Sequence, residues 1–85
     1  MAEDRATRIK RLRMRSMRRG IKEMDLILSA YADDRLAALD EAELDLYDRM
    51  LSENDQELYA WVSGQSEPRE PYVALIADIA RNFQR

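Results

Sequence analysis

The chain has 85 residues, a formal net charge of -3, 46% hydrophobic residues, and neither cysteine nor histidine. This length fits one domain with a modest core, and the missing residue types exclude disulfide bonds, zinc sites built on thiolate or imidazole ligands, and Ser-His or Cys-His nucleophilic sites. A complete active site is therefore not expected, and no apolar run approaches the roughly 20 residues that cross a bilayer.

Positive charge is concentrated near the N-terminus. Nine of the 14 lysine and arginine residues lie in residues 1–22 beside two acids, so this basic arm carries +7 and the remaining residues carry -10. Three interpretations compete: the arm folds against the acidic remainder, docks onto an acidic protein partner, or binds nucleic acid or an anionic membrane. The acidic remainder would repel phosphate, which disfavours the third.

The local pattern predicts helices and no strands. A first helix is expected over residues 5–18, with Ile9, Leu12 and Met17 as its spaced apolar positions. Gly20 is predicted to end this helix in the left-handed conformation. A second helix is expected over residues 21–35, with an inward face made of Met24, Ile27, Leu28 and Tyr31.

Capping residues place the remaining helices. Asp40 with Glu43 three residues later predicts a capping box that opens a third helix reaching residue 52. Its inward face is Leu44, Tyr47, Met50 and Leu51. Asn54 and Glu57 repeat the signal for a fourth helix through residue 62, ended by Gly64. A fifth helix is predicted to start near Pro71, with an inward stripe made of Tyr72, Leu75, Ile76, Ile79 and Phe83.

A glycine and an acid interrupt the basic segment at residues 18–25, where glycine costs a helix interior about 1 kcal/mol relative to alanine. Read as Arg-Gly-x-x-Glu, the residues Arg19, Gly20 and Glu23 resemble the signature of the succinate dehydrogenase assembly factors, the small SdhE-like flavinator proteins. The resemblance continues in order from residue 8 to residue 83. It includes Leu46-Tyr47-Asp48-Arg49-Met50-Leu51 and Leu58-Tyr59-Ala60-Trp61, and it departs from the family pattern in the loop 64–71 and at the C-terminus.

The resemblance implies a single all-α domain over residues 1–85, a compact bundle of about five helices. It also implies a non-enzymatic assembly factor that binds the flavoprotein subunit of succinate dehydrogenase, with that of fumarate reductase as a second client, and promotes covalent attachment of FAD. The FAD and the histidine that receives it belong to the client, and the factor itself holds no cofactor stably and no metal. The factor is expected to be a monomer in the bacterial cytoplasm, with no nucleic acid partner and no membrane insertion.

The partner-binding residues that this resemblance implies are Arg18, Arg19, Gly20, Glu23 and Asp25. Local explanations stay open, because Gly20 also suits a helix end and Glu23 also suits a helix N-terminus or an ion pair with Arg19. Trp61 is interpreted first as a core residue and second as an interface anchor.

Two other function classes also stay open. One is a small helical regulator of the antitoxin type, which would bind nucleic acid through the basic arm. The other is an adaptor with an unrelated client.

Overall fold

The structure, a computed structural model, describes residues 3–84, and these residues form five α-helices and one short 3-10 turn. The elements are α1 (Arg5–Arg15), α2 (Lys22–Arg35), η1 (Leu36–Ala38), α3 (Glu41–Met50), α4 (Asp55–Ser63) and α5 (Val73–Gln84). The predicted all-α bundle of about five helices is confirmed. None of the described helices is long and apolar enough to cross a membrane. The predicted single domain includes residues 1, 2 and 85, which lie outside the described residues.

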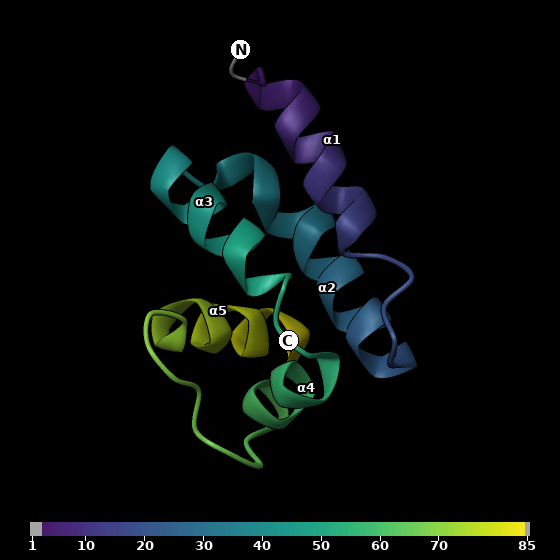
Figure 1. Cartoon of the computed structure of the whole chain (residues 1–85), viewed down its shortest axis with the longest axis vertical. Helices are drawn as coiled ribbons and strands as arrows, with labels where there is room; N and C mark the ends of the chain where they lie inside the picture. Colours follow the sequence, from purple (N-terminus) through teal and green to yellow (C-terminus); the bar gives the residue numbers. More distant parts are fainter. Residues whose placement is uncertain (1–2, 85) are drawn as a thin grey trace.

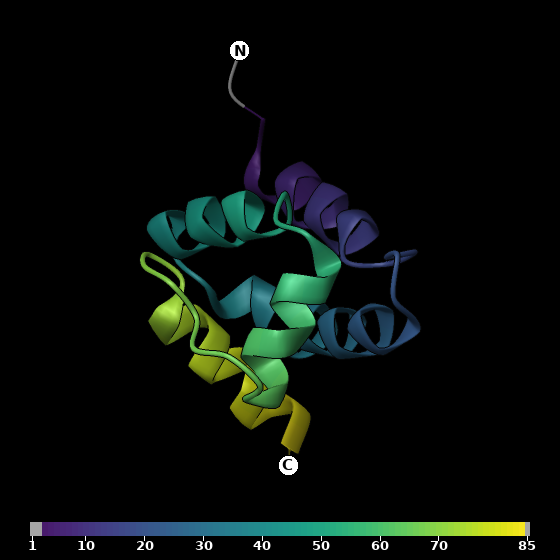
Figure 2. The same cartoon turned by 60° about the horizontal axis from the view of Figure 1, so that its bottom comes forward.

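Helix α2 lies at the centre and packs against α1, α4 and α5. In Figure 1, α1 and α3 lie together toward the N-terminal end of the molecule, and α4 and α5 lie toward the other end. Figure 2 shows the same division, with the long loop after α4 running along the outside of the molecule to the start of α5. The short loop between α1 and α2 is at the edge of the bundle, and it carries Arg19 and Gly20 of the signature, whereas Glu23 lies in the first turn of α2.

The core is built from the apolar faces that the sequence predicts for α2 and α3. The eight predicted side chains are each at most 3% exposed, namely Met24, Ile27, Leu28, Tyr31, Leu44, Tyr47, Met50 and Leu51. The rings of Tyr31 and Tyr47 stack across the two helices with centroids 5.7 Å apart. Trp61 is 7% exposed and stacks on Tyr72, so its interpretation as a core residue is confirmed.

The predicted capping box is present at α3, whereas at α4 Asn54 caps the helix without a returning bond from Glu57 among the described residues. The Asp40 carboxylate accepts the Glu43 N–H at 2.8 Å, and the Glu43 carboxylate accepts the Asp40 N–H at 2.9 Å. The Asn54 side chain accepts the Gln56 N–H at 2.8 Å and thereby caps α4. Gly64 ends α4 with a φ of 84°, a left-handed conformation that glycine adopts without a steric cost.

The first helix ends three residues earlier than predicted, at Arg15. Ser16 is fully buried, and its hydroxyl bonds the Leu12 carbonyl at 2.8 Å and the Tyr47 hydroxyl at 2.6 Å. This buried link fixes the chain where it leaves the helix, so Met17 lies outside α1 and is 49% exposed. The Tyr47 hydroxyl is enclosed in the core, and burial raises the pKa of Tyr47 to about 12.

The last helix differs from its prediction at both ends. It begins at Val73 rather than at Pro71, because its first hydrogen bond runs from the Ile76 N–H to the Tyr72 carbonyl. Phe83 was predicted to face inward but is 54% exposed. The last turn of α5 lies at the edge of the core, where Phe83 borders a surface groove instead of packing into the interior.

Candidate partner-binding site

The loop between α1 and α2 reverses the chain at Arg18, not at Gly20. Arg18 has a φ of 55°, whereas Gly64 is the one described glycine with a positive φ. The Arg18 N–H donates to the Asp25 carboxylate at 2.9 Å, and this bond holds the reversal against the first turns of α2. The prediction that Gly20 ends α1 in a left-handed conformation is therefore wrong.

The Arg19 guanidinium is enclosed within the chain. Its side chain is 11% exposed and forms an ion pair with Asp55, the first residue of α4, at 2.7 Å. Its Nε donates to the same carboxylate at 2.9 Å, and its other nitrogens donate to the Arg15 carbonyl at 2.9 Å and the Leu51 carbonyl at 3.0 Å. Arg19 thus joins the end of α1, the end of α3 and the start of α4, and the alternative pairing with Glu23 is not formed.

Gly20 lies against the same carboxylate. Its N–H donates to the second oxygen of Asp55 at 2.6 Å. A Cβ atom placed on Gly20 would lie 3.2 Å from that oxygen, closer than ordinary van der Waals contact. A glycine is favoured here because it allows the carboxylate to approach the backbone, rather than because of the sign of φ.

Glu23 is exposed in the first turn of α2. Within residues 3–84 its carboxylate forms no hydrogen bond or ion pair, in contrast to Asp25, which accepts bonds from Arg18 and from the Ser29 hydroxyl. The five predicted partner-binding residues therefore divide into two groups. Arg19, Gly20 and Asp25 fold the loop, while Glu23 and the exposed side chain of Arg18 face solvent.

Asp55 is the residue of this site that sequence reasoning missed. Its side chain is 16% exposed and contacts both Arg19 and Gly20. In the sequence it reads as an ordinary acid in the first turn of a helix. Its distance of 35 residues from Gly20 leaves no local signal for the contact.

Most arginines of the basic arm fold against acids, chiefly on α3. Arg5 pairs with Glu41 at 2.8 Å, and Arg8 pairs with Glu41 and Asp45. Arg11 and Arg15 both pair with Asp48. Arg13 pairs with Asp33 on α2. Attraction between the basic and acidic parts of the chain is therefore confirmed for these residues.

Asp48 is the acid on which these arginines converge. Burial alone would raise the pKa of Asp48, but the hydrogen bond from Arg11 and the charges of Arg11, Arg15 and Arg8 outweigh it and hold the pKa below the usual 3.8. The carboxylate is therefore kept in its charged form.

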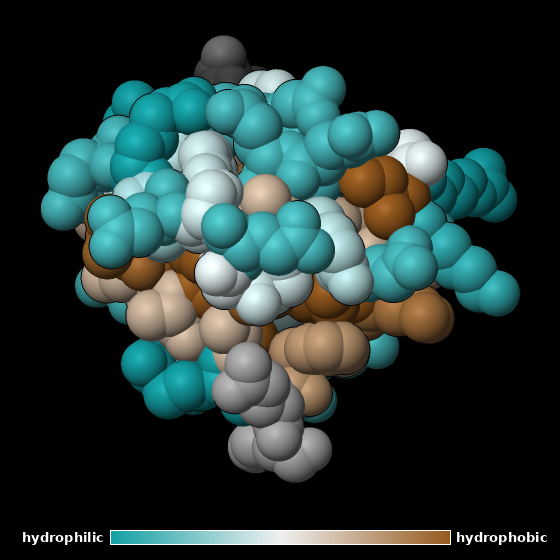
Figure 3. Space-filling view, turned by 90° about the horizontal axis from the view of Figure 1, so that it is seen from below, coloured by the Kyte–Doolittle hydropathy of each residue, from teal (hydrophilic) through white to brown (hydrophobic). Residues whose placement is uncertain are grey.

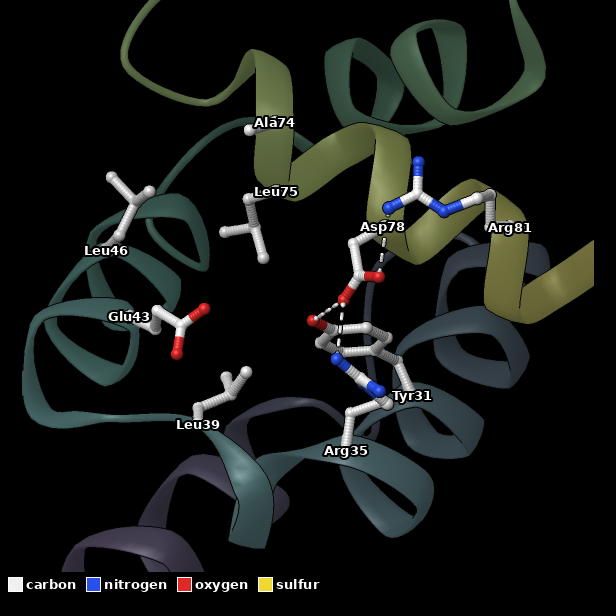
Figure 4. Close-up of a pocket in the computed structure, with 9 residues that line it drawn as sticks. All are labelled: Tyr31, Arg35, Leu39, Glu43, Leu46, Ala74, Leu75, Asp78 and Arg81. Carbon is white, nitrogen blue, oxygen red and sulfur yellow. Dashed lines mark hydrogen bonds and ion pairs between the residues drawn. The ribbon is translucent and has the colours of Figure 1, made fainter.

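A second polar cluster lines a cleft of about 320 Å³ between α2, α3 and α5 (Figure 4). Asp78 accepts the Tyr31 hydroxyl at 2.7 Å and pairs with Arg35 and Arg81. Burial, and then the bond to Asp78, raises the pKa of Tyr31. These polar groups pair with one another, and the residues that line this cleft include neither Glu23 nor any residue of the loop between α1 and α2. Within residues 3–84 no group of three or more acidic side chains is arranged to hold a metal ion.

Comparison with known proteins gives one consistent family. The model of a family described as "Flavinator of succinate dehydrogenase" matches residues 10–83. The chain is 36% identical over 62 residues to the FAD assembly factor SdhE of Legionella pneumophila (strain Lens), which is 73% of this chain and 78% of that protein. It is 46% identical over 68 residues to the mitochondrial succinate dehydrogenase assembly factor 2 of Aspergillus terreus, which is 80% of this chain and 23% of that protein. The corresponding protein of Aspergillus flavus is 44% identical over 72 residues, which is 85% of this chain and 24% of that protein. The chain thus spans about a quarter of the length of these fungal relatives.

Proposed function

Because the chain belongs to the family of succinate dehydrogenase flavinators, we propose that it is an assembly factor that binds the flavoprotein subunit of succinate dehydrogenase. In this proposal it promotes the covalent attachment of FAD to that subunit, and the flavoprotein of fumarate reductase is a second client. The FAD and the histidine that receives it both belong to the client. This chain has no histidine, and its part is to bind the client rather than to hold a flavin stably or to catalyse.

The observation that carries the proposal is the exposed carboxylate of Glu23, which has no hydrogen-bond or ion-pair partner within residues 3–84 and lies beside a loop that is fixed by contacts inside the chain. Arg19 and Gly20 are both held by Asp55, so the start of α2 is presented in one conformation before a client binds. A preorganised surface loses little conformational entropy on binding. Its binding energy is then available to hold a mobile client in the arrangement that favours bond formation.

The nucleic-acid alternative is not favoured. Family membership does not support it, and most arginines of the basic arm are already paired with acids of the same chain. The relatives include bacterial and mitochondrial proteins. A monomer in the bacterial cytoplasm is part of our proposal, and separate localisation and sedimentation measurements would test it.

The proposal is tested by co-expressing the chain with the flavoprotein subunit and measuring covalent flavin as protein-bound fluorescence after denaturing electrophoresis. We expect Glu23→Gln to lower the covalent flavin about tenfold, because a hydrogen-bonded charge contact to the client is lost. The matched control is Glu67→Gln, the same change at an exposed acid in the loop after α4. Wild-type covalent flavin in a folded Glu23→Gln variant would contradict the assignment of Glu23.

A further inference from the structure

A groove with apolar walls lies beside Glu23, where α2, α4 and α5 meet. Its volume is about 300 Å³, and its walls include Leu26 and Ile27 of α2, Val62 of α4 and Phe83 of α5. Glu23 also lines the groove, one helical turn before Leu26 and Ile27 on the same helix. The groove is therefore continuous with the part of the signature segment that faces solvent.

Two large apolar side chains on these walls are exposed to water. Leu26 is 60% exposed and Phe83 is 54% exposed. Other apolar side chains of the same two helices are buried in the core. Figure 3 views the molecule from below, from the end where α4 and α5 lie, and brown apolar side chains are exposed at several places on this face. A hollow with exposed apolar walls and a single charged neighbour has the form of a pocket for an anchor side chain.

Glu23 determines which partner complements the groove. It is the one charged side chain among the described residues that line it, and within residues 3–84 it forms no ion pair. A symmetric contact between two copies of the chain would bring two unpaired Glu23 carboxylates into one interface, which is unfavourable. A nucleic acid would bring its negatively charged phosphates close to the Glu23 carboxylate, and the like charges would repel each other. A protein segment with an apolar side chain and a neighbouring lysine or arginine matches both features.

We propose that this groove is the docking site for a segment of the flavoprotein client. The segment inserts one apolar side chain between Leu26 and Phe83, and its neighbouring lysine or arginine pairs with Glu23. The inference rests on the proposed function, because the proposed partner is the same flavoprotein client. It assigns one role to the apolar walls of the groove and another to Glu23. The apolar anchor supplies most of the affinity, and the ion pair selects the register of the bound segment.

The first test titrates the purified flavoprotein subunit with the wild-type chain and with Leu26→Ala, Phe83→Ala and Val73→Ala. The first two variants remove exposed wall residues, so circular dichroism should stay unchanged while each weakens binding about tenfold. Val73 is 39% exposed at the opposite end of α5 and is the matched control, for which we expect less than a twofold change. If the wild type binds tightly and both groove variants bind with the same affinity as the wild type, the groove is not the docking site, but the proposed function stands. A wild type that does not bind would overturn the proposed function with it.

The second test identifies the occupant. A photo-reactive benzoylphenylalanine at position 26 should cross-link to a client peptide that contains an apolar residue beside a lysine or arginine, and the same group at position 73 should not. Glu23→Lys should then weaken binding, and a change of that client cation to glutamate should restore it. Cross-links between two copies of this chain, or a charge exchange without any recovery, would overturn the proposed occupant.

Discussion

Asp55 uses both of its carboxylate oxygens to fold the signature loop. One oxygen pairs with the Arg19 guanidinium and the other accepts the Gly20 N–H. Both side chains of the pair are mostly enclosed, at 11% and 16% exposed, so the ion pair is screened little by solvent. The loop is thus fixed from the side of α4, while the solvent side of α2 is left for Glu23.

We expect Asp55→Ala to lower the free energy of unfolding by about 2 to 3 kcal/mol, because it leaves an enclosed guanidinium and a backbone N–H without their acceptor. Urea denaturation monitored by circular dichroism measures this change. The matched control is Asp45→Ala, which removes a partner of Arg8 that is 68% exposed and should cost less than about 1 kcal/mol. Equal losses in the two variants would contradict the structural role of Asp55.

Gly20 offers a test of the close approach itself. We expect Gly20→Ala to destabilise the wild type, since its Cβ would meet the Asp55 carboxylate at 3.2 Å. The same substitution should cost less in the Asp55→Ala background, where that contact is absent. A double-mutant cycle from urea denaturation should give a coupling of about 0.5 to 1 kcal/mol. Additive losses would show that the constraint on Gly20 does not come from Asp55.

The signature residues also show which features of single residues could be predicted from the sequence and which could not. The resemblance identified the Arg-Gly-x-x-Glu segment, but the sequence could not say that Arg19 points inward and Glu23 outward. That division depends on Asp55, which is remote in the sequence. Predicted roles of Arg18, Arg19, Gly20, Glu23 and Asp25 in partner binding stay predictions, and the structure gives Glu23 the most accessible carboxylate of the segment.

Helix ends that depend on local contacts were predicted well. The Asp40 capping box, the Asn54 cap and the end of α4 at Gly64 all involve residues within a few positions of one another. Two of the differences depend on more distant parts of the molecule. Helix α1 stops where Ser16 bonds Tyr47, 31 residues away, and Phe83 is exposed because α5 reaches the edge of the core.

We expect Asp40→Ala to lower the free energy of unfolding by about 1 kcal/mol, because the capping box at the start of α3 loses its side-chain acceptor. Thermal unfolding and urea denaturation both measure the loss. Affinity for the flavoprotein subunit at low temperature should not change, since Asp40 lies at α3 and not at the groove. An unchanged free energy of unfolding would argue that the cap contributes nothing to stability.

At the scale of the whole molecule, the chain neutralises its own uneven charge. The arm that carries +7 lies beside an acidic helix, and ion pairs between them hold α1 in place at the N-terminal end of the bundle. Apolar periodicity and capping residues were enough to predict the helices of the bundle. They could not choose among the three interpretations of the arm, because that choice depends on which acids lie opposite each arginine. The side chains of Lys10, Arg18 and Lys22 form no ion pair within residues 3–84. Any electrostatic steering of an acidic client by the arm therefore depends on these three side chains.

The convergence of Arg11 and Arg15 on Asp48 predicts how the whole fold responds to acid. The pKa of Asp48 is held below 3.8 in the folded protein, so the folded state binds its proton less readily than the unfolded chain does. The resulting stabilisation is complete above the pKa of the unfolded chain, near pH 4, and it is lost as the pH falls through the lower pKa of the folded protein.

We expect the free energy of unfolding, measured with urea from pH 6 to pH 2.5, to fall less steeply for Asp48→Asn than for the wild type. The variant should be the less stable protein at pH 6, and the two curves should converge in acid, because protonation removes from the wild type the charge that the substitution has already removed. Parallel curves across this range would contradict the assignment of Asp48 as the acid that anchors the arm.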